Sequence, residues 1–488
     1  MVESVDLRRT AARGTLVNGT FLVGLNALQL IKNFLAAGLI STSAFGVWGL
    51  LTLAVGALTM LKDGLGNKYV QQEEEDQESA FHKAFTIELL ANGALMVLML
   101  VALPGVALLA GNWAIVPPGL VFIATMPAVA LKAPVWIFYR DMRFGRQRLL
   151  ESVDPVVSLA ATVGLAVAGF GYWALVVGYF LGVWAGAATA VAFSPIKLKL
   201  RLDSETSRQY FSFTWPILIA NGGAMLVPSL LILVGERTLG LAGAGMLTLA
   251  GSIANYANKV DQIITETMYP AICRVQDRTD VLYEAFVKSN RLDLIWGIPF
   301  GVGVALFASD LVEFGLGDKW RPGIIAIQAL SLTAAANHLG YNWTAFLRAR
   351  GDTKAFAIAG PIVVVTFLVV TIPLLILFEM KGLAVGMALM TFVSLLVRAH
   401  FLRALFPRYS MLRQAARGIG PVVPGSVCVL LLRAAATGTD RTEAAAFGEL
   451  AIFLLLTVIA TVVMERKLLG EMLSYLRGGS RPLADITV

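Results

Sequence analysis

The stretch SIANYANKVDQIITETMYP, from Ser252 to Pro270, is the part of the sequence that decides the fold. It lies in a long apolar region, yet at about 100° per residue one side of the helix carries polar and charged groups while the other side is apolar. A charge in the middle of a bilayer costs about 2.5–3.5 kcal/mol, so this polar stripe is expected to face protein or water. The stripe comprises Asn255, Asn258, Lys259, Asp261, Gln262, Thr265 and Glu266.

We therefore interpret the segment as one wall of a polar cavity inside the membrane. The alternative is that the same groups hydrogen-bond neighbouring helices and hold the bundle together.

The composition of the chain excludes most soluble classes. Of its 488 residues, 57% are hydrophobic and only 15% are charged, and the mean hydropathy is +0.74. The two cysteines, Cys273 and Cys428, give neither a disulfide framework nor metal-ligand spacing. The three histidines show no HExxH spacing, which argues against a zinc hydrolase. We expect an all-α polytopic membrane protein with no metal and no cofactor, and no role in nucleic-acid binding.

Apolar stretches of about 20 residues predict the transmembrane helices. We count about fourteen of them, separated by charged residues or by Gly and Pro. The predicted ranges are 15–38, 44–62, 84–110, 115–138, 151–170, 172–194, 211–234, 242–268, 286–314, 322–347, 356–378, 382–406, 418–436 and 444–464.

The distribution of basic residues predicts the orientation. Most of the 39 Lys and Arg residues fall in connections that alternate onto one side, which the positive-inside rule assigns to the cytoplasm. Both termini are then cytoplasmic. Residues 465–477, ERKLLGEMLSYLR, alternate charge with Leu and Met as an interfacial helix would.

An internal repeat predicts the domain organisation. GLLTLA at Gly49–Ala54 recurs as GMLTLA at Gly245–Ala250, and the Trp and Arg signals around the fourth predicted helix recur around the tenth. Two parallel six-helix lobes around a central cavity are typical of alternating-access carriers. We predict an N-terminal lobe over 1–205, a C-terminal lobe over 206–410, and two further helices with a cytoplasmic tail over 411–488.

Polar side chains inside other predicted helices would line the same cavity. Lysines in a low-dielectric cleft suit an anionic cargo such as a pyrophosphate, and amide and aromatic side chains suit sugars. Snorkelling or local ion pairing is the alternative for Lys32 and Lys132. The candidate cavity residues are Asn26, Gln29, Lys32, Lys132, Asn221, Asn255, Lys259, Gln262, Asn337, His338 and Asn342. Candidates for ion or proton coupling are Asp261, Glu266 and Glu88, with Asp293 also considered.

Several short motifs carry a resemblance to a known family. They are AFGVW (Ala44–Trp48), YRDMRF (Tyr139–Phe144), AGFGYWALV (Ala168–Val176), Tyr269-Pro270, GDKW (Gly317–Trp320) and LRARGDTK (Leu347–Lys354). In this order, over roughly 10–410, the chain resembles the polysaccharide transporter (Wzx-type oligosaccharide flippase) family of the multidrug/oligosaccharidyl-lipid/polysaccharide exporter superfamily.

The resemblance implies a V-shaped, two-lobe bundle in the bacterial inner membrane. Its expected activity is not enzymatic: it moves undecaprenyl-diphosphate-linked oligosaccharide to the outer leaflet by alternating access. A cation-lined cavity is implied, which would contain Lys32, Lys132 and Lys259. A proton or sodium gradient would drive transport, and the polysaccharide polymerase and export machinery would be partners.

Other functions remain open from the sequence. A lipid II flippase or a multidrug antiporter would share the architecture, although buried lysines argue against cationic drugs. A membrane polymerase or glycosyltransferase would need an external loop or an acidic nucleotide-binding motif, and the run Glu73–Asp76 lacks that geometry. A membrane scaffold would have no need of three lysines within its helices.

Overall fold

A computed structural model of the chain describes residues 21, 24–59, 69, 76–141, 143–350, 354–436 and 441–476. Within parts of the helices only the backbone is described, namely residues 53–59, 109–110, 212–225, 262–263, 266–267, 269–271, 274, 354, 356–357 and 472–476. All regular structure in the described ranges is helical.

The helices follow one another with short connections. After a helix over 24–39, they are α2 (Thr42–Thr59), α4 (Gln77–Ala110), η2 (Trp113–Ile115), α5 (Val116–Ile123), α6 (Met126–Ala130), α7 (Val135–Arg140), α8 (Phe144–Val167), α9 (Tyr172–Ala192), α10 (Ser204–Asn255), α11 (Asn258–Arg274), α12 (Thr279–Leu306), α13 (Ala308–Asp310), η3 (Leu311–Leu316), η4 (Asp318–Gly323), α14 (Ile324–Asn337), α15 (Trp343–Ala349), α16 (Lys354–Thr366), η5 (Phe367–Thr371), α17 (Ile372–Leu405), α18 (Met411–Ile419), η6 (Gly420–Val422), α19 (Val423–Ala435), α20 (Glu443–Met464) and α21 (Arg466–Leu476).

Each of the fourteen predicted ranges overlaps one or more of these helices. In the described part of the chain, eight helices are long and apolar enough to cross a membrane, or nine if the bent pair α12 and α13–η3 is counted as one span. Their most apolar windows are only 17–50% buried within the protein, so much of their surface is left for lipid. The all-α, multi-span class is confirmed, and the count of about fourteen crossings stays a prediction.

Several predicted helices are interrupted. Predicted helix 115–138 is divided into α5, α6 and α7, with Pro127 and Pro134 at two of the breaks. Gly240 in α10 and Glu379 in α17 have non-helical backbone angles, with φ of 71° and 51°, so each of these long helices contains a sharp kink. Such interruptions are tolerated at membrane depth where protein satisfies the freed backbone groups.

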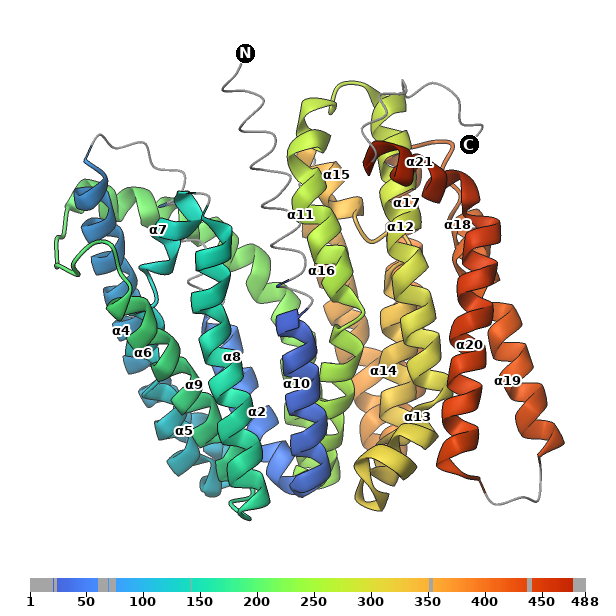
Figure 1. Ribbon diagram of the computed structural model, residues 1–488, viewed down its shortest axis with the longest axis horizontal. Helices are drawn as coiled ribbons and strands as arrows, with labels where there is room; N and C mark the ends of the chain where they lie inside the picture. Colours follow the sequence, from blue (N-terminus) through green and yellow to red (C-terminus); the bar gives the residue numbers. More distant parts are fainter. Residues whose placement is uncertain are drawn as a thin grey trace. The chain divides into compact units, whose positions relative to one another are not determined.

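The chain divides into two compact units, in each of which the long helices lie side by side (Figure 1). The first unit runs to Gly251 and also takes Gly315–Gly323 and Leu375–Met380. The second contains Ser252–Phe314, Ile324–Leu374 and the chain from Lys381 onward. The three-part division expected from the sequence repeat stays a prediction.

In the first unit, the two copies of the repeated hexapeptide contact each other. A Cβ atom on Gly49 would overlap the side chain of Thr248, and one on Gly245 would overlap the carbonyl of Thr42. The helices α2 and α10 can therefore cross at this point only because both positions are glycine. The same unit contains η4, where the Trp320 indole donates to the Ala37 carbonyl at 2.9 Å.

Small residues also bring α8 and α9 together. A Cβ atom at Gly182 would lie 2.7 Å from the Asp154 carbonyl oxygen, which shows that the two backbones nearly touch. The connecting turn uses Gly169 and Gly171, whose φ angles of 83° and 56° favour glycine. This contact places polar side chains of α8 in a buried position.

The second unit is held together by an aromatic core and by an ionic network. The ring of Phe286 packs against those of Phe346 and Phe406 at centroid distances of 5.1 and 5.4 Å. At the other end of α12, the Arg433 guanidinium donates to Asp310 at 2.8 Å and to Glu449 at 2.9 Å. Arg441 pairs with the same two carboxylates. Helices α19 and α20 are thus tied to the end of α12 and to α13.

Candidate functional site

The candidate site is built on a break in the tenth predicted helix. Helix α14 ends at Asn337 and α15 begins at Trp343, so residues 338–342 form a turn instead of continuing the helix. Gly340 lies in this turn with φ of 70°, a backbone conformation that favours glycine. The break removes intrahelical hydrogen bonds and frees backbone carbonyls inside an apolar protein interior, where they need new partners.

Two buried side chains supply those partners. The Arg398 guanidinium, on α17, donates to the carbonyls of Asn337 at 2.5 Å and Leu339 at 2.7 Å. The Asn290 side chain, on α12, donates to the His338 carbonyl at 2.8 Å. The turn is therefore fixed from two neighbouring helices, which determines the position of the His338 ring.

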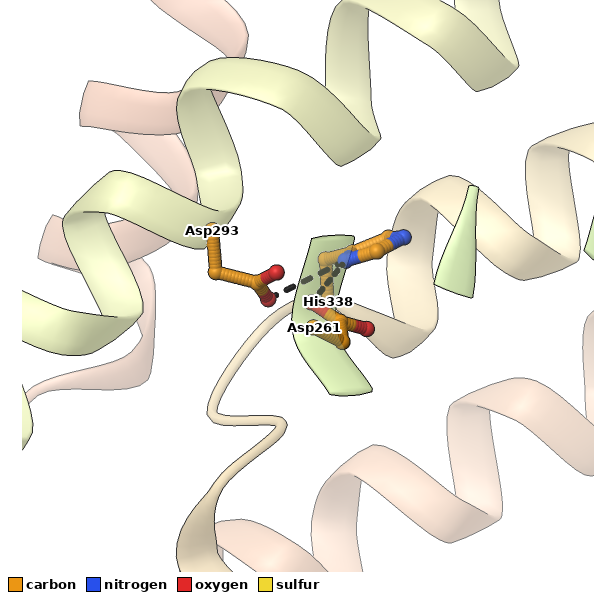
Figure 2. Close-up of side chains that lie close together, drawn as sticks. All are labelled: Asp261, Asp293 and His338. Atoms are coloured by element: carbon orange, nitrogen blue, oxygen red, sulfur yellow. Dashed lines mark hydrogen bonds and ion pairs between the residues drawn. The ribbon is translucent and has the colours of Figure 1, made fainter. Parts of the chain in front are cut away.

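The Nδ1 side of the His338 ring faces two carboxylates (Figure 2). Its Nδ1 atom is 3.0 Å from Oδ1 of Asp261, on α11, and 3.0 Å from Oδ2 of Asp293, on α12. The side chains of all three residues have an exposed fraction of 0%. We call these three residues the buried triad.

The fit of the imidazole against α12 depends on Gly297. A Cβ atom at Gly297 would overlap the ring of His338, at its Cγ, Cδ2 and Nδ1 atoms. Gly297 lies one turn after Asp293 on the same helix, so the glycine leaves the space in which the ring reaches the carboxylate.

The buried triad retains unused capacity for binding. In the part of the chain with described side chains, Oδ2 of Asp261, Oδ1 of Asp293 and Nε2 of His338 have no hydrogen-bond partner. Arg398 is close enough to Asp293 to attract it electrostatically. With a neutral imidazole, two carboxylates and one guanidinium leave one negative charge, and burying a net charge is unfavourable. One proton or one monovalent cation would bring the cluster to neutrality.

The triad also has the composition of a metal-ligand set. One imidazole nitrogen and two carboxylate oxygens lie within 4.8 Å of one another. These are ligand types that divalent metals accept, although Nδ1 stands at ordinary hydrogen-bond distance from both oxygens. The absence of a metal site, expected from the sequence, stays a prediction.

A second buried polar cluster lies in the first unit, around α8. Lys32 is 5% exposed, and its ammonium donates to the Ser158 hydroxyl at 3.2 Å. Lys132 forms an ion pair with Asp154. Asp154 and Ser158 are one turn apart on α8, so the two lysines converge on one face of that helix. Lys132 therefore has the local ion-pair partner that the sequence analysis gave as its alternative.

The remaining predicted residues lie in different surroundings. Lys259 and Asn255 are exposed, and the Asn258 amide donates to the Asn255 side chain at 3.3 Å. In the first unit, Asn26 is half-buried, Gln29 is exposed, and Glu88 is buried with the Asn92 amide donating to it at 3.0 Å. The side chains of Asn221, Gln262 and Glu266 lie outside the described residues.

Two candidates belong to the turn that carries His338. Asn337 is half-buried, and its carbonyl accepts from Arg398. Asn342 is 1% exposed, and among the described side chains its amide has no hydrogen-bond partner. Both lie within four residues of His338 in the sequence.

Sequence reasoning identified Asp261 and His338 but did not connect them. It considered Asp293 for ion or proton coupling, but Arg398 was not among the candidate residues, and the structure leaves Arg398 only 8% exposed inside the second unit. It gave no role to Asp154 or Asn290. The sequence did contain one usable signal. Asp154, Asp293 and Arg398 are charged residues inside predicted helices, and such residues need an internal partner.

Comparison with solved structures defines the class of protein. The fold resembles the lipid II flippase MurJ in an inward closed conformation, with a TM-score of 0.69, 13% identity, and coverage of 92% of this chain and 99% of that chain. It also resembles an inward-facing multidrug resistance MATE family transporter of the MOP superfamily, with a TM-score of 0.62, 13% identity, and coverage of 81% and 100%. The chain is thus a multi-span membrane protein with the fold seen in these transporters.

The family follows from the sequence comparisons. The family described as "Polysaccharide biosynthesis protein" matches residues 35–325, and the chain belongs to it. The lipopolysaccharide biosynthesis protein WzxC of Escherichia coli (strain K12) is 22% identical over 353 residues, covering 69% of each protein. An uncharacterised membrane protein in the cps region of Klebsiella pneumoniae is 25% identical over 167 residues, covering 34% of each. The resemblance to the polysaccharide transporter family is confirmed.

Proposed function

We propose that the protein is a flippase that translocates undecaprenyl-diphosphate-linked oligosaccharide across the bacterial inner membrane by alternating access. The proposal rests above all on the match of residues 35–325 to the polysaccharide biosynthesis family. The similarity to WzxC and the fold shared with a flippase support it. Its product would serve exopolysaccharide, capsule or O-antigen synthesis, with a polymerase and export machinery acting afterwards.

For the cargo, we propose that lysines bind the diphosphate. Lys259 is exposed at the polar side of α11 and is available to a ligand. Lys32 and Lys132 converge on α8 and are engaged there by Ser158 and Asp154, so they would have to exchange these partners for the diphosphate. An ammonium group binds phosphate as a point charge from which the ligand can leave again, as transport requires.

For the driving force, we propose that the buried triad takes up one proton in each cycle. Nδ1 of His338 at 3.0 Å from both carboxylates is a hydrogen-bonding arrangement, which favours a proton over a sodium ion placed between them. If the imidazole is neutral, the two carboxylates outnumber the one guanidinium beside them, which supports uptake of a single positive charge. Its neutralisation would change the packing of α11, α12 and the turn before α15, which are the three elements that the triad joins.

A leaflet assay tests the flippase proposal. Cells lacking the protein should accumulate lipid-linked repeat units at the inner leaflet, unreachable by an external label. Repeat units that are flipped but not extended would indicate a polymerase and contradict the proposal.

A second experiment tests the coupling. Asp293→Asn should abolish transport driven by a pH gradient while the protein still reaches the membrane. Asp318→Asn, at an exposed aspartate with a side chain 79% accessible, is the matched control and should transport normally. Transport by Asp293→Asn that still follows an imposed pH gradient would refute coupling through the triad, and dependence on sodium alone would replace the proton with that ion.

Lipid II flipping is the second candidate, because the similarity to MurJ covers 92% of this chain. Expression in cells depleted of their own lipid II flippase decides between the two. Growth of those cells would favour lipid II as the cargo. If those cells do not grow, but the protein restores polysaccharide export in a strain that lacks its polysaccharide flippase, oligosaccharide is favoured.

A further inference from the structure

A basic pocket lies at one end of the second unit, apart from the buried triad. It has a volume of about 280 Å³ and is formed where α12, α18, the end of α20 and the start of α21 meet. Its basic lining residues are Lys288, Arg291, Arg417, Arg466 and Lys467. The acidic lining residues are Glu465 and Glu471, so the pocket has five basic and two acidic side chains.

Both glutamates are already engaged by two of the five basic residues. Glu465, whose side chain is 5% exposed, pairs with Arg291, and Glu471 pairs with Lys288 at 2.9 Å. Nε of Arg291 is buried without an acceptor among the described side chains. The pocket thus keeps a surplus of donors and of positive charge.

The other three basic residues have no acidic partner in the described part of the chain. Arg417 extends from α18, while Arg466 and Lys467 are exposed at the first two positions of α21. The unbalanced charge therefore comes from both sides of the pocket, and an anion in it would join α18 to α21.

The pocket also lies at the end of an apolar span, where a membrane interface is expected. Helix α20 is an apolar span of 22 residues that ends at Met464, and α21 begins two residues later. Leu468 of α21 is 4% exposed, so this helix packs its apolar side onto the unit and keeps its basic residues outside. A lipid phosphate lies at this level, just beyond the hydrocarbon region.

We infer that this pocket binds the headgroup of an anionic phospholipid, which pins α21 and the end of α20 against α12 and α18. Basic pockets between transmembrane helices at an interface are suited to such headgroups. A pocket of about 280 Å³ has room for a phosphoryl headgroup. The inference does not depend on the transport proposal.

Native mass spectrometry of the full-length protein with added lipid tests the inference. The protein should bind phosphatidylglycerol and not phosphatidylcholine. The double variant Arg417→Gln with Lys467→Gln removes two unpaired charges without leaving a buried carboxylate alone. At about 1 kcal/mol for each basic residue, phosphatidylglycerol binding should weaken about 30-fold. Equal binding of both lipids by the wild type, or unchanged binding by the double variant, would overturn the inference.

Two controls make the result specific. Arg403→Gln changes an exposed basic residue in the last turn of α17, outside the pocket, and should bind phosphatidylglycerol as the wild type does. The charge-preserving pair Arg417→Lys with Lys467→Arg should also retain binding, which separates a charge effect from misfolding. Displacement of phosphatidylglycerol from the pocket by undecaprenyl diphosphate would assign the pocket to the transport substrate and overturn the phospholipid assignment.

Discussion

Gly297→Ala perturbs the buried triad without removing any of its titratable groups. The added methyl group would come closer than 3.0 Å to the His338 ring, whereas ordinary contacts between carbon atoms are about 3.5–4.0 Å. The ring must therefore retreat by at least about 0.5 Å. That movement takes both distances from Nδ1 to the carboxylate oxygens from 3.0 Å to the limit at which a hydrogen bond is lost.

The size of the effect follows from the hydrogen bonding of Nδ1. This nitrogen carries at most one hydrogen, which the two carboxylates share, so the loss is about that of one hydrogen bond to a charged group, about 1.5–3 kcal/mol. Overpacked cores usually relax to a net destabilisation of about 1–3 kcal/mol, so we expect about 2–3 kcal/mol for this variant. Proton-driven transport should be reduced by more than this loss of stability alone would cause, because the geometry of the proton site is altered.

Thermal unfolding of the purified protein and transport as a function of pH measure the two effects. Gly301→Ala on the same helix is the matched control, since its methyl group would overlap the Ser331 carbonyl and not the triad. It should destabilise the protein and leave the pH profile of transport unchanged. Gly105→Ala, inside α4 where the structure has open space, should raise stability by about 0.5–1 kcal/mol at most and leave the pH profile unchanged. A Gly297→Ala protein with the wild-type pH profile would refute the role given to the position of His338.

Three further predictions concern charges elsewhere in the chain. Lys259→Glu should abolish polysaccharide export with normal membrane insertion, measured by surface polysaccharide and by the amount of protein in the membrane; wild-type export would count against a cargo-binding lysine. Lys132→Ala leaves Asp154 without its partner and should lower the unfolding free energy by up to about 3–5 kcal/mol, and adding Asp154→Ala should restore part of it in a double-mutant cycle. At the start of α10, hydrogen bonds from the Thr206 hydroxyl and amide lower the pKa of Asp203. The ionised carboxylate therefore stabilises the folded protein above the pKa of the unfolded state, about 3.9, and this stabilisation is lost as the pH falls through the pKa of the folded state. Thr206→Val should reduce this acid sensitivity in thermal melts, and an unchanged pH dependence would show that Asp203 does not contribute.

The polar stripe of α11 illustrates how far periodicity can be taken. Periodicity correctly placed Asp261 and Lys259 on a helix with a polar side. It placed them on one stripe, whereas the structure buries Asp261 completely and leaves Lys259 exposed. Periodicity gives the angle of a side chain about its own helix, but its burial depends on which other helix packs there.

The sequence by itself determined the class of this protein, because twenty-residue apolar stretches and scarce charges allow few folds other than a bundle of membrane helices. Its ordered motifs also indicated the family. Only the tertiary structure decided which polar groups meet. Asp261, Asp293 and His338 are separated by 32 and 45 residues, and they converge because a broken helix is held by Asn290 and Arg398 while Gly297 makes room for the imidazole. A local pattern cannot encode that convergence, since it arises from contacts between helices that are distant in the chain.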